Sequence, residues 1–111
     1  MSVDQRMVVD AIGTEKTTGD VVLTIADHLD WTDVPGHIRI LQEKLDDYMN
    51  FLDAGEIFDA YPASEGKKKK ISIMFRHGPL PQEATEFLSR AGRVLEGAGY
   101  PLIHAIYEKS A

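Results

Sequence analysis

Acidic and imidazole side chains gather in one short stretch of this sequence. The segment Asp-His-Leu-Asp-Trp occupies residues 27–31, and Asp33 and His37 follow closely. Carboxylates and imidazoles are common ligands of zinc, manganese and iron, so this turn is a candidate metal site. Its spacing fits neither the His-Glu-x-x-His pattern nor the calcium loop with its fixed glycine. The spacing therefore identifies no metal, and we predict neither a bound metal nor a cofactor.

The same turn offers a candidate general base. His28 would accept a proton while Asp27 or Asp30 orients its ring. Such a pair also needs a nucleophile or electrophile, and the sequence contains no serine elbow, phosphate-binding glycine loop or dinucleotide fingerprint. The alternative function is therefore a small metal-dependent or acid–base enzyme that uses this turn together with His37.

A structural interpretation of the turn is simpler, and we favour it. The carboxylates of Asp27, Asp30 and Asp33 would accept backbone N–H bonds as turn and helix-cap residues. Trp31 would plug the junction between the preceding strand and the following helix. If the turn instead binds a partner, its candidate binding residues are Asp27, His28, Asp30, Trp31 and His37.

The elements around the turn follow the order β-β-α-β-α-β. Two β-branched runs flank a polar loop with glycine at each end, which predicts a hairpin. Apolar residues then recur every 3.6 positions in two segments, which predicts two helices. They recur every second position between these helices and after the second one, which predicts two more strands. We expect strands at residues 7–12, 21–26, 71–75 and 102–107, and helices from about residue 34 to Gly55 and over residues 82–96.

Apolar residues also indicate which side of each element faces the core. Val21, Leu23 and Ile25 form the better core face of the second strand. Thr32 or Asp33 is the expected N-cap of the first helix. Asp47 falls outside that helix's apolar stripe. The predicted stripes are Ile38, Leu41, Leu45, Tyr48, Met49 and Leu52 in the first helix, and Ala84, Phe87, Leu88, Ala91, Val94 and Leu95 in the second.

These elements predict a single α+β domain over residues 1–111. Two amphipathic helices and four short strands are most economically arranged as a two-layer sandwich, a four-stranded sheet with both helices on one face. The strand order stays open, because the connection between the first helix and the third strand permits a parallel or an antiparallel return.

Composition limits the function further. The 111 residues carry a formal net charge of −6 and include no cysteine. The absence of cysteine excludes disulfides, thiolate metal sites and cysteine nucleophiles. An acidic chain is a poor general ligand for nucleic acid. With neither a signal pattern nor a long apolar run, the chain is expected to be cytoplasmic, with no membrane contact.

Two further surfaces are candidates for binding. The lysine run at residues 67–70 is predicted to lie on a solvated edge strand, where its charges prevent pairing with the edge of another sheet. If Ile71, Ile73 and Phe75 face the helices, then Met74 and Arg76 look outward with Ser72, beside Val22, Thr24 and Ala26. Such a mixed open face suits solvent or a protein partner, and a homodimer through it is one possibility. His104, alone on the last strand, is expected to be structural.

Several segments resemble a family of small bacterial proteins of unknown function. The most distinctive is Thr-Ile-Ala-Asp-His-Leu-Asp-Trp, residues 24–31. The resemblance starts at residue 21 and continues through residues 41–45, Tyr48, Phe51, residues 55–57, Tyr61-Pro62, Gly66-Lys67 and the strand–helix–strand tail. It implies a bacterial stand-alone domain and supplies no catalytic residues.

The leading hypothesis is a non-enzymatic domain that binds another protein or itself. It would use the open sheet face, with Met74 and Arg76, or its acidic helix surface. An inhibitor or immunity-type protein that neutralises a basic toxin is one form of this hypothesis, suggested by charge alone.

Overall fold

The computed structural model describes residues 2–107 and has the predicted β-β-α-β-α-β order. The α+β fold class is therefore confirmed. A short second helix and a single 3₁₀ turn, neither of them predicted, follow the first long helix. The elements are β1 Ala11–Thr14, β2 Val21–Asp27, α1 Val34–Asp53, α2 Glu56–Ala60, η1 Pro62–Ser64, β3 Lys69–Phe75, α3 Gln82–Gly97 and β4 Leu102–Ile106.

The four strands form one mixed sheet in the order β1-β2-β3-β4. The hairpin strands β1 and β2 are antiparallel, with Ala11 opposite Thr24. β2, β3 and β4 are parallel, with Leu23 opposite Ile71 and Ile71 opposite Leu102. Parallel neighbours need a long crossover, which the segments containing α1 and α3 provide. The sequence had left this strand order open.

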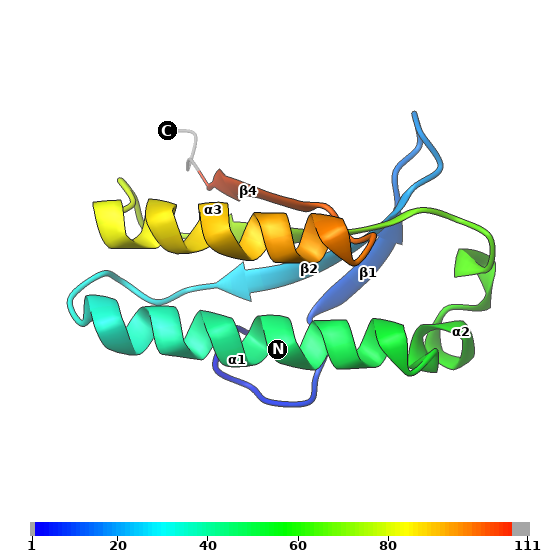
Figure 1. Cartoon of the computed structure of the whole chain (residues 1–111), viewed down its shortest axis with the longest axis horizontal. Coiled ribbons are helices and arrows are strands. Elements are labelled where there is room, and N and C mark those ends of the chain that lie inside the picture. Colours follow the sequence, from blue (N-terminus) through cyan, green and yellow to red (C-terminus); the bar gives the residue numbers. More distant parts are fainter. Residues whose placement is uncertain (1, 108–111) are drawn as a thin grey trace.

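One face of the sheet is buried and the other is open. The predicted core residues of β2 and β3 are at most 1% exposed. Figure 1 shows α1 and α3 side by side in front of the strands. Residues with the opposite orientation, such as Ala26 and Met74, are exposed. Apolar burial against the helices is the main stabilising contribution to this arrangement. The buried set is Val21, Leu23, Ile25, Ile71, Ile73 and Phe75.

α1 begins and ends as its sequence predicts. Asp33 is the N-cap, and its carboxylate accepts the backbone N–H of Gly36 at 3.1 Å. Gly55 follows the helix with a φ of 76°, a left-handed conformation that glycine adopts without steric cost. Asp47, outside the predicted apolar stripe, is nevertheless buried, because the N-terminal segment lies over that side of the helix.

Two sequence predictions are wrong. The first strand begins at Ala11 rather than at residue 7, and Met7 has a φ of 59°. The lysine run does not guard an edge, because β3 lies between β2 and β4. Lys70 instead forms ion pairs with Glu15 and Asp20, at 3.0 and 3.3 Å.

The helical stripes also differ at one position. Val94 of α3, predicted to be part of the core, is 66% exposed. It lines a groove of about 240 Å³ between α1 and α3. No helix within residues 2–107 is long and apolar enough to cross a membrane.

Candidate functional site

A buried contact between Asp27 and His37 forms the centre of the predicted turn. Asp27 ends β2 on its buried face, and the first turns of α1 bring His37 against it. The two residues are 1% and 3% exposed, and His37 Nε2 lies 2.5 Å from Asp27 Oδ2. Burial raises the pKa of Asp27, while its hydrogen bond with His37 acts in the opposite direction.

Both ring nitrogens of His37 are occupied by the protein. Nδ1 lies 2.9 Å from the backbone oxygen of Asp30, which can only accept, so Nδ1 carries a proton. The Nε2 contact with Asp27 is then an ion pair or a neutral pair sharing one proton. Both ring nitrogens are therefore used by contacts within the protein, and these contacts join β2 to α1.

Trp31 covers this pair. Its ring stacks on the His37 imidazole with centroids 3.8 Å apart, and it also contacts Phe75. Its Nε1–H donates to the backbone oxygen of His77 at 3.0 Å. Trp31 thus joins the ends of β2 and β3 to the start of α1. This arrangement agrees with the role expected from the sequence, in which Trp31 packs at the junction between the strand and the helix.

The acidic residues of the turn accept backbone N–H bonds. Asp27 Oδ1 accepts from Leu29 at 3.0 Å, and Asp30 Oδ1 accepts from Thr32 at 3.0 Å. Together with the Asp33 cap, these bonds confirm the structural interpretation of the carboxylates. Within residues 2–107 no three His, Cys, Asp or Glu side chains are grouped as a metal site requires.

His28 is separated from the buried pair. Its side chain is 49% exposed, and its nearest carboxylate is that of Asp4, at 4.0 Å. Neither Asp27 nor Asp30 forms a hydrogen bond with it among the described residues. The structure therefore brings Asp27, Trp31 and His37 together and leaves His28 on the surface. The His28 general-base geometry does not form.

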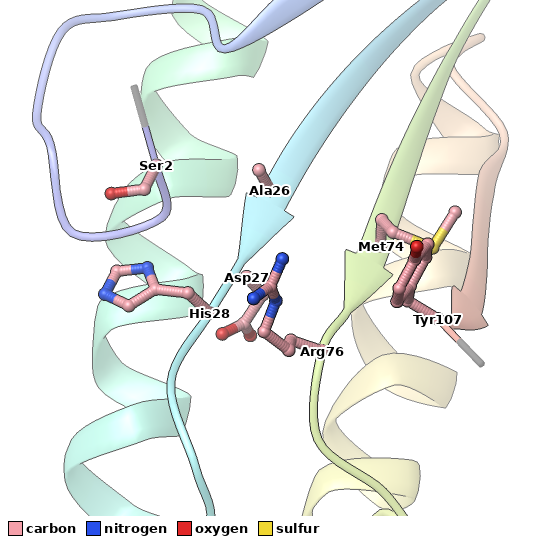
Figure 2. Close-up of a pocket in the computed structure, with 7 residues that line it drawn as sticks. All are labelled: Ser2, Ala26, Asp27, His28, Met74, Arg76 and Tyr107. Atoms are coloured by element: carbon pink, nitrogen blue, oxygen red, sulfur yellow. The ribbon is translucent and has the colours of Figure 1, made fainter. Parts of the chain in front are cut away.

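A shallow hollow lies on the open sheet face where β2 and β3 end. Its volume is about 470 Å³. Figure 2 shows Ser2 and His28 on one side, Met74 and Tyr107 on the other, and Arg76 between them. Met74 and Arg76 are thus on the outward side that the strand alternation predicts. No ion pair of Arg76 occurs within residues 2–107.

Apolar side chains continue from this hollow across β3 and β4. Met74, Ile103 and Tyr107 are 37%, 47% and 53% exposed, and we call these three residues the open-face patch. They share one face because Ser72 is paired with Ile103 and Met74 with Ala105. Sequence analysis missed Ile103 and Tyr107. The period-two pattern of the last strand could have placed both beside Met74.

A second polar cluster, also missed from sequence, fastens the N-terminal segment to the body. Lys44 of α1 is fully buried and donates to Asp10 Oδ1 at 2.9 Å. The Tyr48 hydroxyl donates to the backbone oxygen of Thr24 at 2.6 Å and accepts the N–H of Asp10 at 2.8 Å. Burial raises the pKa of Tyr48. Within residues 2–107 these groups bond one another and the backbone, which indicates a structural role.

The fold and its surfaces define a small α+β domain with two polar clusters in its interior and an exposed apolar surface on its sheet. The chain belongs to a family of unknown function, DUF6572, which it matches over residues 1–108. No curated protein and no solved structure matches it. The match confirms the expected resemblance to a family of unknown function.

Proposed function

We propose that this chain is a non-enzymatic binding domain that associates with protein chains, its own copies included, through the open face of β3 and β4. One observation carries the proposal. The open-face patch exposes three large side chains on β3, on β4 and directly after β4, and two of them, Met74 and Tyr107, line the hollow that contains Arg76. Covering such side chains contributes about 25 cal/mol for each Å² removed from water.

Charge supports a protein partner at the same place. The chain has a formal net charge of −6, so most of its surface repels another acidic chain. At the hollow, the cationic Arg76 reverses that tendency locally. An acidic partner, including a second copy, is therefore accepted better at this face than elsewhere.

The alternative, an acid–base enzyme, gains less support from the geometry. His37 has both ring nitrogens bonded, and His28 is apart from the acidic residues that would orient it. Inhibition of a basic toxin rests on net charge alone, since no contact among the described residues adds to it. We retain a bacterial cytoplasmic location as part of the proposal, and cell fractionation tests it.

Analytical ultracentrifugation of the wild type and two variants tests the binding surface. Met74→Glu places a charge within the open-face patch, and we expect it to weaken self-association through this patch at least about tenfold, or 1.4 kcal/mol. Val94→Glu is the matched control, because Val94 is an exposed apolar residue on the helix layer. The proposal fails if the wild type stays monomeric up to about 1 mM. It also fails if both variants weaken association equally.

A further inference from the structure

β4 is an edge strand whose outer side carries free backbone groups. The N–H of Ile71 donates to the Pro101 oxygen, and the N–H of Tyr107 donates to the Phe75 oxygen. Because backbone groups alternate in direction along a strand, residues 101, 103, 105 and 107 bond toward β3. The N–H and C=O groups of Leu102, His104 and Ile106 therefore point away from the sheet. Within residues 2–107, no other strand lies beyond β4.

These outward groups are spaced to pair with themselves. In an antiparallel pair, two residues directly opposite each other exchange both N–H···O bonds. If His104 lies opposite His104 of a second copy, Leu102 lies opposite Ile106, and every outward group gains a partner. This register has two-fold symmetry, as closed homodimers require.

Charge distinguishes this edge from the other one. The uncharged stretch at β4 runs from Pro101 to Tyr107 and ends at Glu108, whereas at β1 only the strand itself, Ala11–Thr14, is uncharged, with Asp10 before it and Glu15 and Lys16 after it. Charged residues at an edge prevent edge-to-edge pairing, and their absence permits it. For a chain of net charge −6, this neutral strand is a place where two copies can approach without like-charge repulsion.

The helix next to β4 also leaves room for a second copy. Figure 1 shows α3 alongside β4, and Arg90 and Val94 face the groove toward α1. By helical periodicity, the opposite flank of α3 carries Thr85, Ser89 and Gly92, with Glu96 at its end. A Cβ built on Gly92 would meet no atom within 4 Å. Small side chains on this flank allow two α3 helices to approach closely.

From these observations we infer that two copies of the chain pair antiparallel through β4, with His104 at the two-fold axis. The two sheets become continuous, and the two open-face patches lie on the same side of the joined sheet. The inference keeps the proposed self-association but assigns it to the β4 edge, which leaves the open-face patch available to other protein chains. The competing arrangement is a dimer packed face to face through the open sheet face, without β4 pairing.

Single cysteines test the register, since the natural chain has none. Under mild oxidation, we expect His104→Cys to form a disulfide-linked dimer, because directly opposed residues have Cα atoms about 5.5 Å apart. Ala105→Cys is the matched control. In the same register, the residues at position 105 of the two chains would be offset by two positions. The distance between them would be about 7–8 Å, which is too far for an unstrained disulfide. In a face-to-face dimer His104→Cys should not cross-link, since Ala105 is on the open face and His104 is on the helix side.

Proline at the same position tests the backbone pairing. His104→Pro removes an outward N–H and leaves the bonds to β3 in place, so dimerisation should be lost. His104→Ala keeps the N–H and should dimerise as the wild type does. If wild type and His104→Pro form equally stable dimers, or if only Ala105→Cys cross-links, the β4 geometry is wrong while self-association stands. If the wild type is monomeric at every concentration, both proposals fail. Should His104→Pro not fold, the cysteine pair decides alone.

Discussion

Lys44 Nζ lies 2.9 Å from Asp10 Oδ1, and the side chains are 0% and 2% exposed. The ammonium group also donates to the backbone oxygens of Gln5 and Val8, both at 2.7 Å. These three acceptors use all of its N–H groups. The other Asp10 oxygen, Oδ2, accepts the N–H of Ala26. One buried lysine therefore holds the N-terminal segment against both α1 and β2.

Replacing Lys44 by methionine should destabilise the domain by about 3–5 kcal/mol, because the buried Asp10 carboxylate would lose its cationic partner and two carbonyl groups would lose their donor. Urea unfolding measures the change in the free energy of unfolding. The double variant Lys44→Met/Asp10→Asn removes the uncompensated carboxylate, so it should be more stable than Lys44→Met alone. A double variant less stable than Lys44→Met would show that the buried charge is not the cause.

Trp31→Ala should destabilise the domain by about 2–3 kcal/mol. The change removes the stacking on His37, the bond to the His77 carbonyl and the cover of the Asp27–His37 pair. His28→Ala in the same turn is the control. Because the His28 side chain is half exposed, its loss should change stability by no more than about 0.5 kcal/mol. Thermal melts of the two variants with equal midpoints would contradict this account of the turn.

Periodicity predicted the long elements well, because their burial depends on residues close in sequence. The apolar repeats of α1 and α3 and the alternation in β2 and β3 are each complete within one element. Val94 is the exception in α3, since only the placement of α1 decides that it lines an open groove.

The N-terminal segment could not be predicted in this way. Residues 7–9 are consecutive apolar residues that include two valines, as in a strand, yet the Met7 N–H donates to Asp47 Oδ2, and the Val8 oxygen accepts from Lys44. These partners are 40 and 36 positions away. The Asp27–His37 pair is similar, since sequence brought both residues into one turn but could not show that they bond each other. In each case, tertiary contacts decide where polar groups are satisfied.

Acid stability should depend on Asp47. Hydrogen bonds from Arg6, and less strongly from the Met7 N–H, hold the pKa of Asp47 below its ordinary value of 3.8. A carboxylate with a lowered native pKa adds stability above its unfolded pKa, and this stability is lost as the pH falls through the native pKa. Asp47→Asn should therefore be less stable than the wild type at neutral pH, and the difference should shrink below about pH 4.

The control for this measurement is Asp46→Asn on the same helix. Asp46 is exposed and, within residues 2–107, accepts a hydrogen bond from the Gln42 side chain, so Asp46→Asn changes the same residue type without removing a contact to Arg6 or to the N-terminal backbone. Urea unfolding at a series of pH values compares the three proteins. A difference between wild type and Asp47→Asn that persists unchanged to the lowest pH would show that ionisation of Asp47 is not the source.

The close contact between Gly36 and the Asp33 cap predicts that two substitutions will not be additive. A Cβ on Gly36 would come within 2.8 Å of Asp33 Cγ, so alanine there must displace the capping carboxylate. Gly36→Ala should thus lose a cap worth about 1 kcal/mol and gain a similar amount of helix propensity, with almost no net effect.

In an Asp33→Ala background, no cap remains to be displaced. Gly36→Ala should then stabilise the domain by up to about 1 kcal/mol, the propensity gain alone. Asp33→Ala by itself should cost about 1 kcal/mol. Urea unfolding of the wild type, both single variants and the double variant gives the coupling energy directly. Equal effects of Gly36→Ala in the two backgrounds would mean that alanine and the Asp33 cap coexist, and that the helix start tolerates a side chain at this position.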